Sequence, residues 1–203
     1  MEKKHIAEHR DVGQRWRKTN PRSGHGEWAP VANRPDPVEL IESQNTERLD
    51  WLVPIRRARM VETPFTFYRG AAKIMASDLA STAGPELQVQ LCGDAHLSNF
   101  GVFASPERRL VFDLNDFDET LPGPFDWDVK RLAASLVIAA EDRGWKEGVG
   151  RELAEETTRS YRNAMANFAQ DSWLETWYRH VPMADLYSMA ELQGASKKQV
   201  KRG

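Results

Sequence analysis

The sequence of 203 residues contains a single cysteine, Cys92. One cysteine excludes an internal disulfide, and with it the class of small secreted domains that disulfides hold together. Such a chain is typical of a reducing compartment, so we expect a cytoplasmic protein. The length suffices for one ordinary domain with a substantial core.

Long apolar runs and a strong net charge are also lacking. The longest apolar run, residues 133–140, is far too short for the roughly 20 residues that cross a bilayer, and no apolar signal core follows Met1. The net charge is −2. Basic residues gather in residues 1–35 and 193–203, and such runs are more often solvated ends than nucleic-acid contacts. We therefore expect no membrane partner and no nucleic-acid partner.

The first part of the chain predicts an arm followed by helices. Residues 1–35 are rich in Arg, Gly, Pro and Asn without a period, which indicates a mostly irregular arm. Asp36 followed by Pro37 predicts a helix start with Asp36 as its N-cap. This helix is expected to run toward Leu52 and to end near Pro54.

The next segments predict one more helix and then β structure. After residues 64–70, small and apolar side chains repeat every three or four positions over residues 72–79, which indicates a helix. Alternation of apolar and polar residues predicts a strand over residues 87–91. Residues 100–103 and 110–114 predict the two strands of a hairpin.

The last part of the sequence is helical. From Asp126 the pattern is almost entirely apolar, which predicts a central helix that ends at Gly144. Further helices are expected over residues 153–168 and from Trp173, with an interruption at Pro182. The order of elements predicts an α+β fold in which helices dominate.

Acidic side chains gather between the predicted strand and the central helix. From residue 94 to residue 128 the chain has two arginines against eight acids, which are Asp94, Glu107, Asp113, Asp116, Asp118, Glu119, Asp126 and Asp128. Carboxylates this close repel one another and resist losing water. A divalent cation relieves both effects, because Mg²⁺ binds carboxylate and amide oxygens and often a phosphate as well.

Several of these oxygens are expected to converge. Asp94 follows the strand at a glycine turn, and Asn99 lies across a short loop from it. The hairpin then returns the chain so that Asp116 arrives beside Asn99, while Asp118 is a candidate for holding a second ion or for orienting the first. The arrangement predicts a phosphoryl-transfer site, which needs an acceptor held in line, a group that takes its proton and cations that neutralise the phosphates.

Two motifs carry a resemblance to known enzymes. The segment Gly93-Asp94-Ala95-His96-Leu97-Ser98-Asn99 resembles the catalytic loop of aminoglycoside phosphotransferases, choline kinases and other kinase-like enzymes. Asp116-Phe117-Asp118 resembles their metal-binding turn, and residues 123–128 resemble the stretch that anchors their loop. Over most of residues 25–203 the sequence is similar to a bacterial group, domain-of-unknown-function family 2252 (DUF2252).

The resemblance implies a kinase-like catalytic lobe over residues 36–192. Asp94 would take the acceptor's proton, and Asn99 and Asp116 would bind Mg²⁺, with Asp118 nearby. The cofactors would be Mg²⁺ and ATP or another nucleoside triphosphate. The partner would be a small hydroxylated acceptor.

Four further residues are candidates for supporting roles. By the resemblance, His96 would brace the loop, and Asp126 or Asp128 would cap the central helix and hydrogen-bond the loop backbone. Arg69 is expected to pair with an acid or to reach a phosphate. Lys130 and Arg131 are left open between pairing with the acids and facing solvent.

The sequence departs from the kinase-like pattern in two respects. Cys92 stands where these loops usually have a histidine, and no Gly-x-Gly-x-x-Gly segment or strand lysine is present to clamp ATP phosphates. Members of the group are understood to be longer, with a glycine-rich strand pair and a lysine beyond this point. The basic tail 193–203, ending at Gly203, is typical of a truncation.

These departures leave other functions open. One is a truncated or pseudo-kinase domain that binds an ion or a partner without turnover. Another is a metallophosphatase, although no second metal motif is present. An EF-hand from Asp113 is excluded, because Phe117 and Asp118 occupy the positions that need an oxygen ligand and a glycine.

Overall fold

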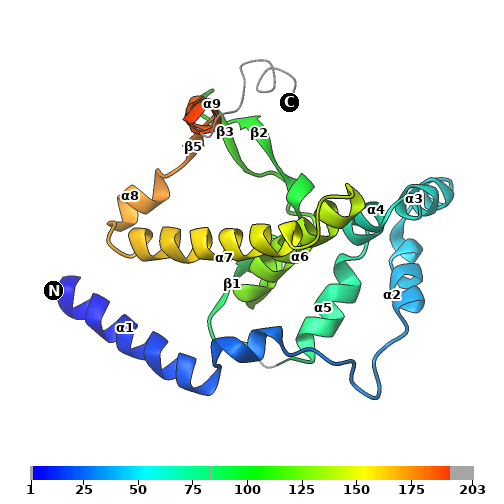
Figure 1. Ribbon diagram of the computed structural model, residues 1–203, viewed down its shortest axis with the longest axis horizontal. Coiled ribbons are helices and arrows are strands. Elements are labelled where there is room, and N and C mark those ends of the chain that lie inside the picture. Colours follow the sequence, from blue (N-terminus) through cyan, green and yellow to red (C-terminus); the bar gives the residue numbers. More distant parts are fainter. Residues whose placement is uncertain (1, 83, 193–203) are drawn as a thin grey trace.

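Two long helices, α6 (Asp126–Asp142) and α7 (Val149–Phe168), form the most extensive helix pair of the fold (Figure 1). The protein is represented by a computed structural model that describes residues 2–82 and 84–192. Gly144 ends α6 as predicted, with the positive φ of 63° that a helix C-terminus favours. The backbones approach closely at Gly150, where a Cβ would lie 3.0 Å from the Cα of Val137.

Four short helices precede the β structure and lie at one end of the molecule (Figure 1). They are α2 (Pro37–Ser43), α3 (Leu52–Met60), α4 (Pro64–Arg69) and α5 (Ala72–Ala80), with the 3₁₀ turn η2 (Asn45–Glu47) after α2. Asp36 is the N-cap of α2, as predicted, and its carboxylate accepts hydrogen bonds from two backbone N–H groups. Helix α4 contacts α3 and α6, so it links this group to the central pair.

The prediction of one helix reaching Pro54 is wrong. Helix α2 ends at Ser43, and Pro54 is the third residue of α3 instead of the end of a helix. The first turn of a helix has no internal acceptors for its N–H groups, so proline is tolerated there. The segment 64–70, expected only to lead into a helix, is itself α4, with Thr63 in a capping box.

The prediction of an irregular arm is wrong over Glu2–Thr19, which form α1, and over Arg22–Gly26, which form the 3₁₀ helix η1. The sequence of α1 is rich in Glu, Lys, Arg and Gln, which lose little side-chain freedom in a helix, and it contains no proline. Residues 27–35 form no helix or strand. The predicted basic tail, residues 193–203, lies outside the described residues.

The strands form two small antiparallel sheets. In the first, β1 (Gln88–Leu91) pairs with β4 (Leu121–Pro124). In the second, β2 (Phe100–Ala104) and β3 (Leu110–Leu114) form the predicted hairpin, and β5 (Val181–Pro182) adds to β3. The α+β fold with dominant helices is therefore confirmed.

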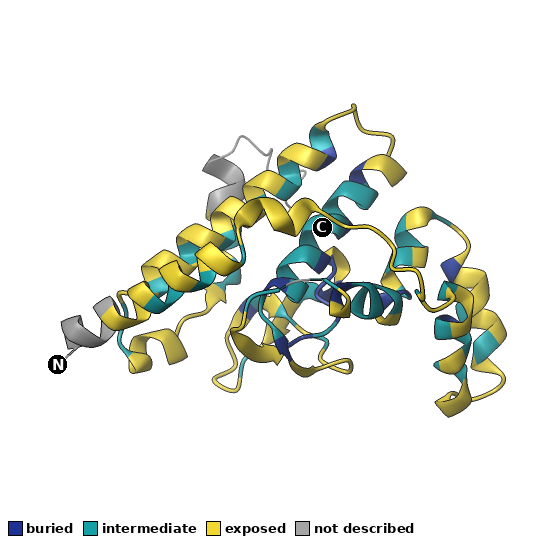
Figure 2. Ribbon diagram, turned by 90° about the horizontal axis from the view of Figure 1, so that it is seen from below, coloured by how far each residue is buried: buried dark blue, intermediate teal, exposed yellow. Residues whose placement is uncertain are grey.

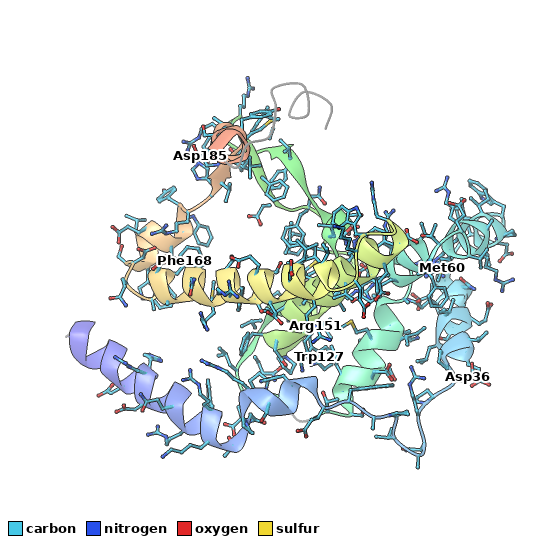
Figure 3. All side chains as sticks on the ribbon, in the orientation of Figure 1. Asp36, Met60, Trp127, Arg151, Phe168 and Asp185 are labelled. Carbon is cyan, nitrogen blue, oxygen red and sulfur yellow. The ribbon has the colours of Figure 1, made fainter. Side chains whose placement is uncertain are left out.

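Two helices follow α7 and lead back to the second sheet. They are α8 (Trp173–Trp177) and α9 (Met183–Leu192), with β5 between them at the predicted interruption. Phe168, labelled in Figure 3, ends α7, and the guanidinium of Arg179 lies 5.1 Å from its ring. None of the described helices is long and apolar enough to cross a membrane.

Buried residues gather where β1, the loop after it and α6 meet (Figure 2). The buried apolar side chains are mostly small, and several polar ones are buried with them, namely Asp94, His96, Asn99, Asp126, Arg131 and Ser135. Buried polar groups need partners. The centre of this fold is therefore a polar network as much as an apolar core, and it contains the predicted loop.

Candidate functional site

The loop after β1 begins with a turn that only glycine fits. Gly93 has a φ of +88°, and a Cβ there would lie 1.9 Å from the carbonyl oxygen of Glu119. Backbone at positive φ and at this distance excludes a side chain. The turn therefore holds the loop 93–99 directly against the segment that follows Asp118.

Asp128 ties the start of this loop to the central helix. Its carboxylate accepts hydrogen bonds from the backbone N–H groups of Cys92 (2.7 Å) and Gly93 (3.1 Å). Burial raises the pKa of Asp128, and the two backbone hydrogen bonds oppose this. The loop start is thereby fixed to the first turn of α6.

Asp126 lies close by but serves another part of the molecule. Its carboxylate is 2.8 Å from the Nζ of Lys130 and 3.3 Å from the Nδ1 of His25, which belongs to η1. It forms no hydrogen bond to the loop among the described residues. The N-cap position of α6 is Phe125, so neither Asp126 nor Asp128 is the N-cap, although both lie in the first turn, where negative charge is favourable.

Asp94 is buried and paired with Arg131. The Nε of Arg131 donates to Asp94 Oδ1 at 2.7 Å, and the two residues are only 6% and 2% exposed. The Nη2 of Arg131 donates to the carbonyl oxygen of Tyr68 (2.7 Å), its Nη1 donates to the Sδ of Met75 (3.8 Å), and its guanidinium lies 4.0 Å from the Tyr68 ring. A buried ion pair of this kind needs such additional partners.

Arg131 is the site residue whose place the sequence did not determine. It lies on α6 directly before a mostly apolar run, and a charged residue at the edge of such a run is a signal of a buried polar partner. Its neighbour Lys130 pairs with Asp126 instead. Of the two alternatives that the sequence left open, Lys130 and Arg131 therefore both pair with acids.

His96 and Ser135 hold the middle of the loop. His96 Nδ1 accepts the backbone N–H of Ser98 at 3.1 Å, and Ser135 Oγ accepts that of Leu97 at 3.0 Å. Burial lowers the pKa of His96, although the nearby charge of Asp94 opposes the shift. Because Nδ1 accepts an N–H, any proton on the neutral ring is on Nε2, which lies 3.7 Å from Asp94 Oδ2.

Asn99 joins the loop to the hairpin. Its Nδ2 donates to the backbone oxygen of Asp94 at 2.7 Å, and its own backbone oxygen accepts the N–H of Asn115 at 3.1 Å. The amide oxygen of Asn99 accepts no hydrogen bond from any described residue. Because the NH₂ group of Asn99 donates to Asp94, the amide oxygen of Asn99 remains available to bind a ligand in the cleft.

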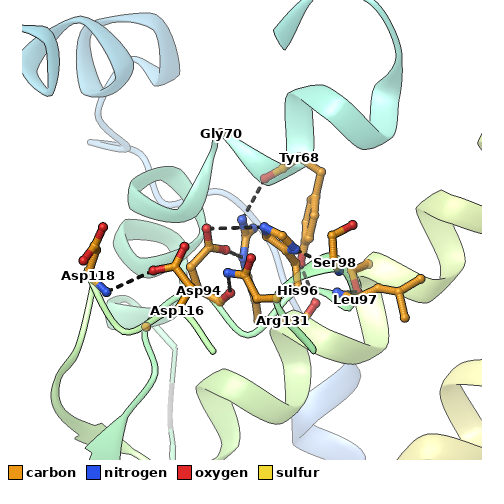
Figure 4. A network of polar contacts seen from close by, with 12 residues as sticks. Tyr68, Gly70, Asp94, His96, Leu97, Ser98, Asp116, Asp118 and Arg131 are labelled. Atoms are coloured by element: carbon orange, nitrogen blue, oxygen red, sulfur yellow. Dashed lines mark hydrogen bonds and ion pairs between the residues drawn. The ribbon is translucent and has the colours of Figure 1, made fainter. Parts of the chain in front are cut away.

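The acidic turn after β3 lies next to the loop. Cys92 Sγ donates to the backbone oxygen of Asp116 at 3.0 Å, and Asp116 Oδ1 accepts the N–H of Asp118 at 3.3 Å. Figure 4 shows the carboxylates of Asp116 and Asp94 turned toward each other, with the Arg131 guanidinium on the other side of Asp94. No basic side chain separates the two acids in this network.

These acids influence one another. Glu119 is exposed as a residue, yet partial removal of its carboxyl from water and then the charges of the three site aspartates raise its pKa. Like charges that face one cleft favour a bound cation. Hard oxygens from Asn99, Asp116 and Asp118 suit Mg²⁺, which keeps several waters and takes few protein ligands.

The ligands are nevertheless not assembled in advance. Within the described part of the chain, no three His, Cys, Asp or Glu side chains form a group arranged for a metal ion. One oxygen of Asp94 is already taken by Arg131. The loop and the turn bring the predicted residues to one place, but a metal would need to complete the geometry.

All four predicted site residues line one cleft of about 670 Å³. Asp94, Asn99, Asp116 and Asp118 line one side with His96 and Glu119. The other side is lined by residues around α3 and the end of α4, among them the arginines Arg48, Arg56, Arg59 and Arg69. Arg69, expected to pair with an acid or reach a phosphate, forms no ion pair within the described residues.

A comparison with known proteins gives one match. Residues 48–202 match the family model described as an uncharacterised protein conserved in bacteria, DUF2252. Neither the curated proteins nor the solved structures contain a match to this chain. The matched range includes α3, the loop 93–99, the acidic turn and α6, and so every residue that lines the cleft from Arg48 onward.

Proposed function

Because the chain belongs to the DUF2252 family, whose description names no activity, we propose its function from the residues that line the cleft. The proposed function is that of a kinase-like catalytic lobe. With Mg²⁺, this lobe would transfer a nucleotide γ-phosphoryl group to a small hydroxylated acceptor. The observation that carries this proposal is the common cleft wall formed by Asp94, Asn99 and Asp116. Phosphoryl transfer asks little of a protein beyond positioning and charge stabilisation. Both are available on this wall.

Asp94 is the proposed general base. Arg131 holds its Oδ1, and His96 lies next to its Oδ2, so the carboxylate has a fixed orientation at the cleft. A base held in this way accepts the proton of the acceptor hydroxyl as the phosphoryl group is transferred. General-base catalysis of this kind contributes about 10²–10⁴ in rate.

Asn99 and Asp116 are the proposed Mg²⁺ ligands, with Asp118 as a third oxygen donor. When bound, the ion would neutralise charge on the phosphate oxygens. The chain's own contribution is to hold these oxygens in place. Asn99 does so through its hydrogen bond to the Asp94 backbone, and Asp116 through the contact of its backbone with Cys92.

A substitution of Asp94 tests the proposal. We expect Asp94→Asn to bind Mg²⁺ and ATP as the wild type does and to lose at least about 100-fold in turnover, because the general base is removed. The measurement is phosphoryl transfer to a panel of amino sugars, amino alcohols and sugars, together with calorimetric binding of ATP. Asp113→Asn is the matched control, since Asp113 is exposed on β3 and does not line the cleft. Full turnover in Asp94→Asn would remove Asp94 from this role.

A second candidate is a domain that binds an ion or a partner without turnover. The pairing of Asp94 with Arg131 and the incomplete metal geometry favour it. It predicts that the wild type binds Mg²⁺ through Asp116 but transfers no phosphoryl group to any acceptor. The same panel of acceptors therefore separates the two functions.

A further inference from the structure

The part of the cleft formed around α3 and the end of α4 is rich in arginine and has one acid, Glu62. Arg48 follows η2, Arg56 and Arg59 lie on α3, and Arg69 is the last residue of α4; all four line the cleft. We call this set the arginine wall. Of these four arginines, the sequence predicted a role only for Arg69.

The arginine wall is not neutralised by ion pairs within the described residues. Five described arginines outside the wall form ion pairs, namely Arg34, Arg57, Arg131, Arg159 and Arg179, while the other described arginines form none. Within the described residues, the side chains of Arg48, Arg59 and Arg69 form no ion pair or hydrogen bond. They remain unpaired although acids line the same cleft.

Arg56 adds a buried donor to this wall. Its Nη2 donates to the carbonyl oxygen of Gly70 at 2.8 Å, while its Nη1 is buried and has no hydrogen-bond partner among the described residues. Burial and then the positive charge of Arg48 lower the pKa of Arg56. A buried donor without an acceptor is destabilising, and an anion beside Nη1 would supply the missing acceptor.

We propose that the arginine wall binds the polyphosphate group of the nucleotide. Guanidinium groups suit phosphate oxygens because they donate two parallel hydrogen bonds in a planar fork. A polyphosphate between the walls meets the arginines on one side and, through a divalent cation, the acids on the other. Both sets of unpaired charges are then compensated by one ligand.

This inference rests on the proposed function for the identity of the ligand, but the binding itself can be tested without turnover. The probe is inorganic tripolyphosphate, titrated by calorimetry without Mg²⁺ at low and at physiological salt. We expect the double variant Arg48→Ala, Arg59→Ala to bind at least about tenfold more weakly than wild type, because two charged donors to the phosphate oxygens are removed. Salt should weaken wild-type binding more than that of the variant.

The control is Arg57→Ala. Arg57 is exposed on the same helix α3, pairs with Glu42 and does not line the cleft, so its removal changes net charge without changing the wall. We expect its affinity for tripolyphosphate to stay within about twofold of wild type, since distant surface charges are screened. Arg48 and Arg59 are exposed, and circular dichroism should show both variants to be folded.

Two outcomes overturn the arginine wall as a phosphate site: no tripolyphosphate binding by the wild type, or equal affinities for the double variant and Arg57→Ala. Phosphoryl transfer in which the double variant keeps the wild-type KM for ATP would also overturn it, while the proposed function stands. Tripolyphosphate binding that depends on Arg48 and Arg59 in a protein without any transfer activity supports the wall and contradicts the proposed function instead.

Discussion

Cys92 lies at the end of β1, where it is 2% exposed, and its thiol contacts the backbone of Asp116. Burial, opposed by a backbone hydrogen bond and reinforced by nearby carboxylates, raises the pKa of this thiol from 9.0 to about 11. The protonated thiol is therefore favoured by folding. Its contribution to stability is complete below pH 9 and is lost as the pH rises through 11.

The free energy of unfolding should reflect this shift. Two pKa units correspond to about 2–3 kcal/mol. We expect the stability difference between wild type and Cys92→Ala, measured by urea unfolding, to shrink by about 2 kcal/mol between pH 8 and pH 11. Parallel pH profiles for the two proteins would contradict this.

At the scale of single residues the sequence identified acids better than their partners. Asp94, Asn99, Asp116 and Asp118 were predicted to meet, and all four line one cleft. The partner of Asp94, Arg131, was left open, because pairing depends on how α6 packs against the loop. A motif identifies which residues are present, but their contacts depend on tertiary packing.

At the scale of elements, the turn at Gly93 decides how the loop meets the acidic segment. A Cβ at this position would overlap the Glu119 carbonyl oxygen. Gly144 provides a comparison, because it also has positive φ, 63°, but has no atom within 4 Å of an added Cβ. Comparing substitutions at Gly93 and Gly144 therefore separates the cost of backbone strain from the cost of steric overlap.

We expect Gly93→Ala to destabilise the protein by at least about 3 kcal/mol and Gly144→Ala by about 1 kcal/mol. Left-handed backbone costs alanine roughly 1–2 kcal/mol, and only Gly93 adds a clash with backbone that cannot move aside. Urea unfolding of the two variants is the measurement. Equal losses of stability in the two variants would show that the segment after Asp118 shifts to make room for the added Cβ and does not fix the loop.

The elements that the sequence predicted well are those with a long, regular pattern. Helices α6 and α7 and the β2–β3 hairpin are confirmed near their predicted bounds. Strand β4 was missed, because its sequence, Leu-Pro-Gly-Pro, carries residues that are rare in strands and tolerated only where few ladder hydrogen bonds are required. Helix α1 was missed because charged residues without an apolar stripe give no periodic signal.

At the scale of the whole molecule, the feature that motifs did not reveal is the cleft with two oppositely charged walls. The acid wall is formed by neighbouring segments of the chain. The arginine wall is formed by α3 and its flanks, and its position depends on the packing of α4 against α3 and α6. Contacts between such distant segments are set by tertiary packing, which no local pattern encodes.

The central claim is that oxygens of the loop and of the acidic turn hold one ion. The most direct test is a calorimetric titration of Mg²⁺, in the presence of ATP, into wild type, Asp116→Asn and the control Asp113→Asn. Loss of one charged ligand should weaken Mg²⁺ binding at least about tenfold in Asp116→Asn, through the lost attraction between ion and carboxylate, and leave Asp113→Asn as the wild type. Indistinguishable titrations for Asp116→Asn and the wild type would contradict the account.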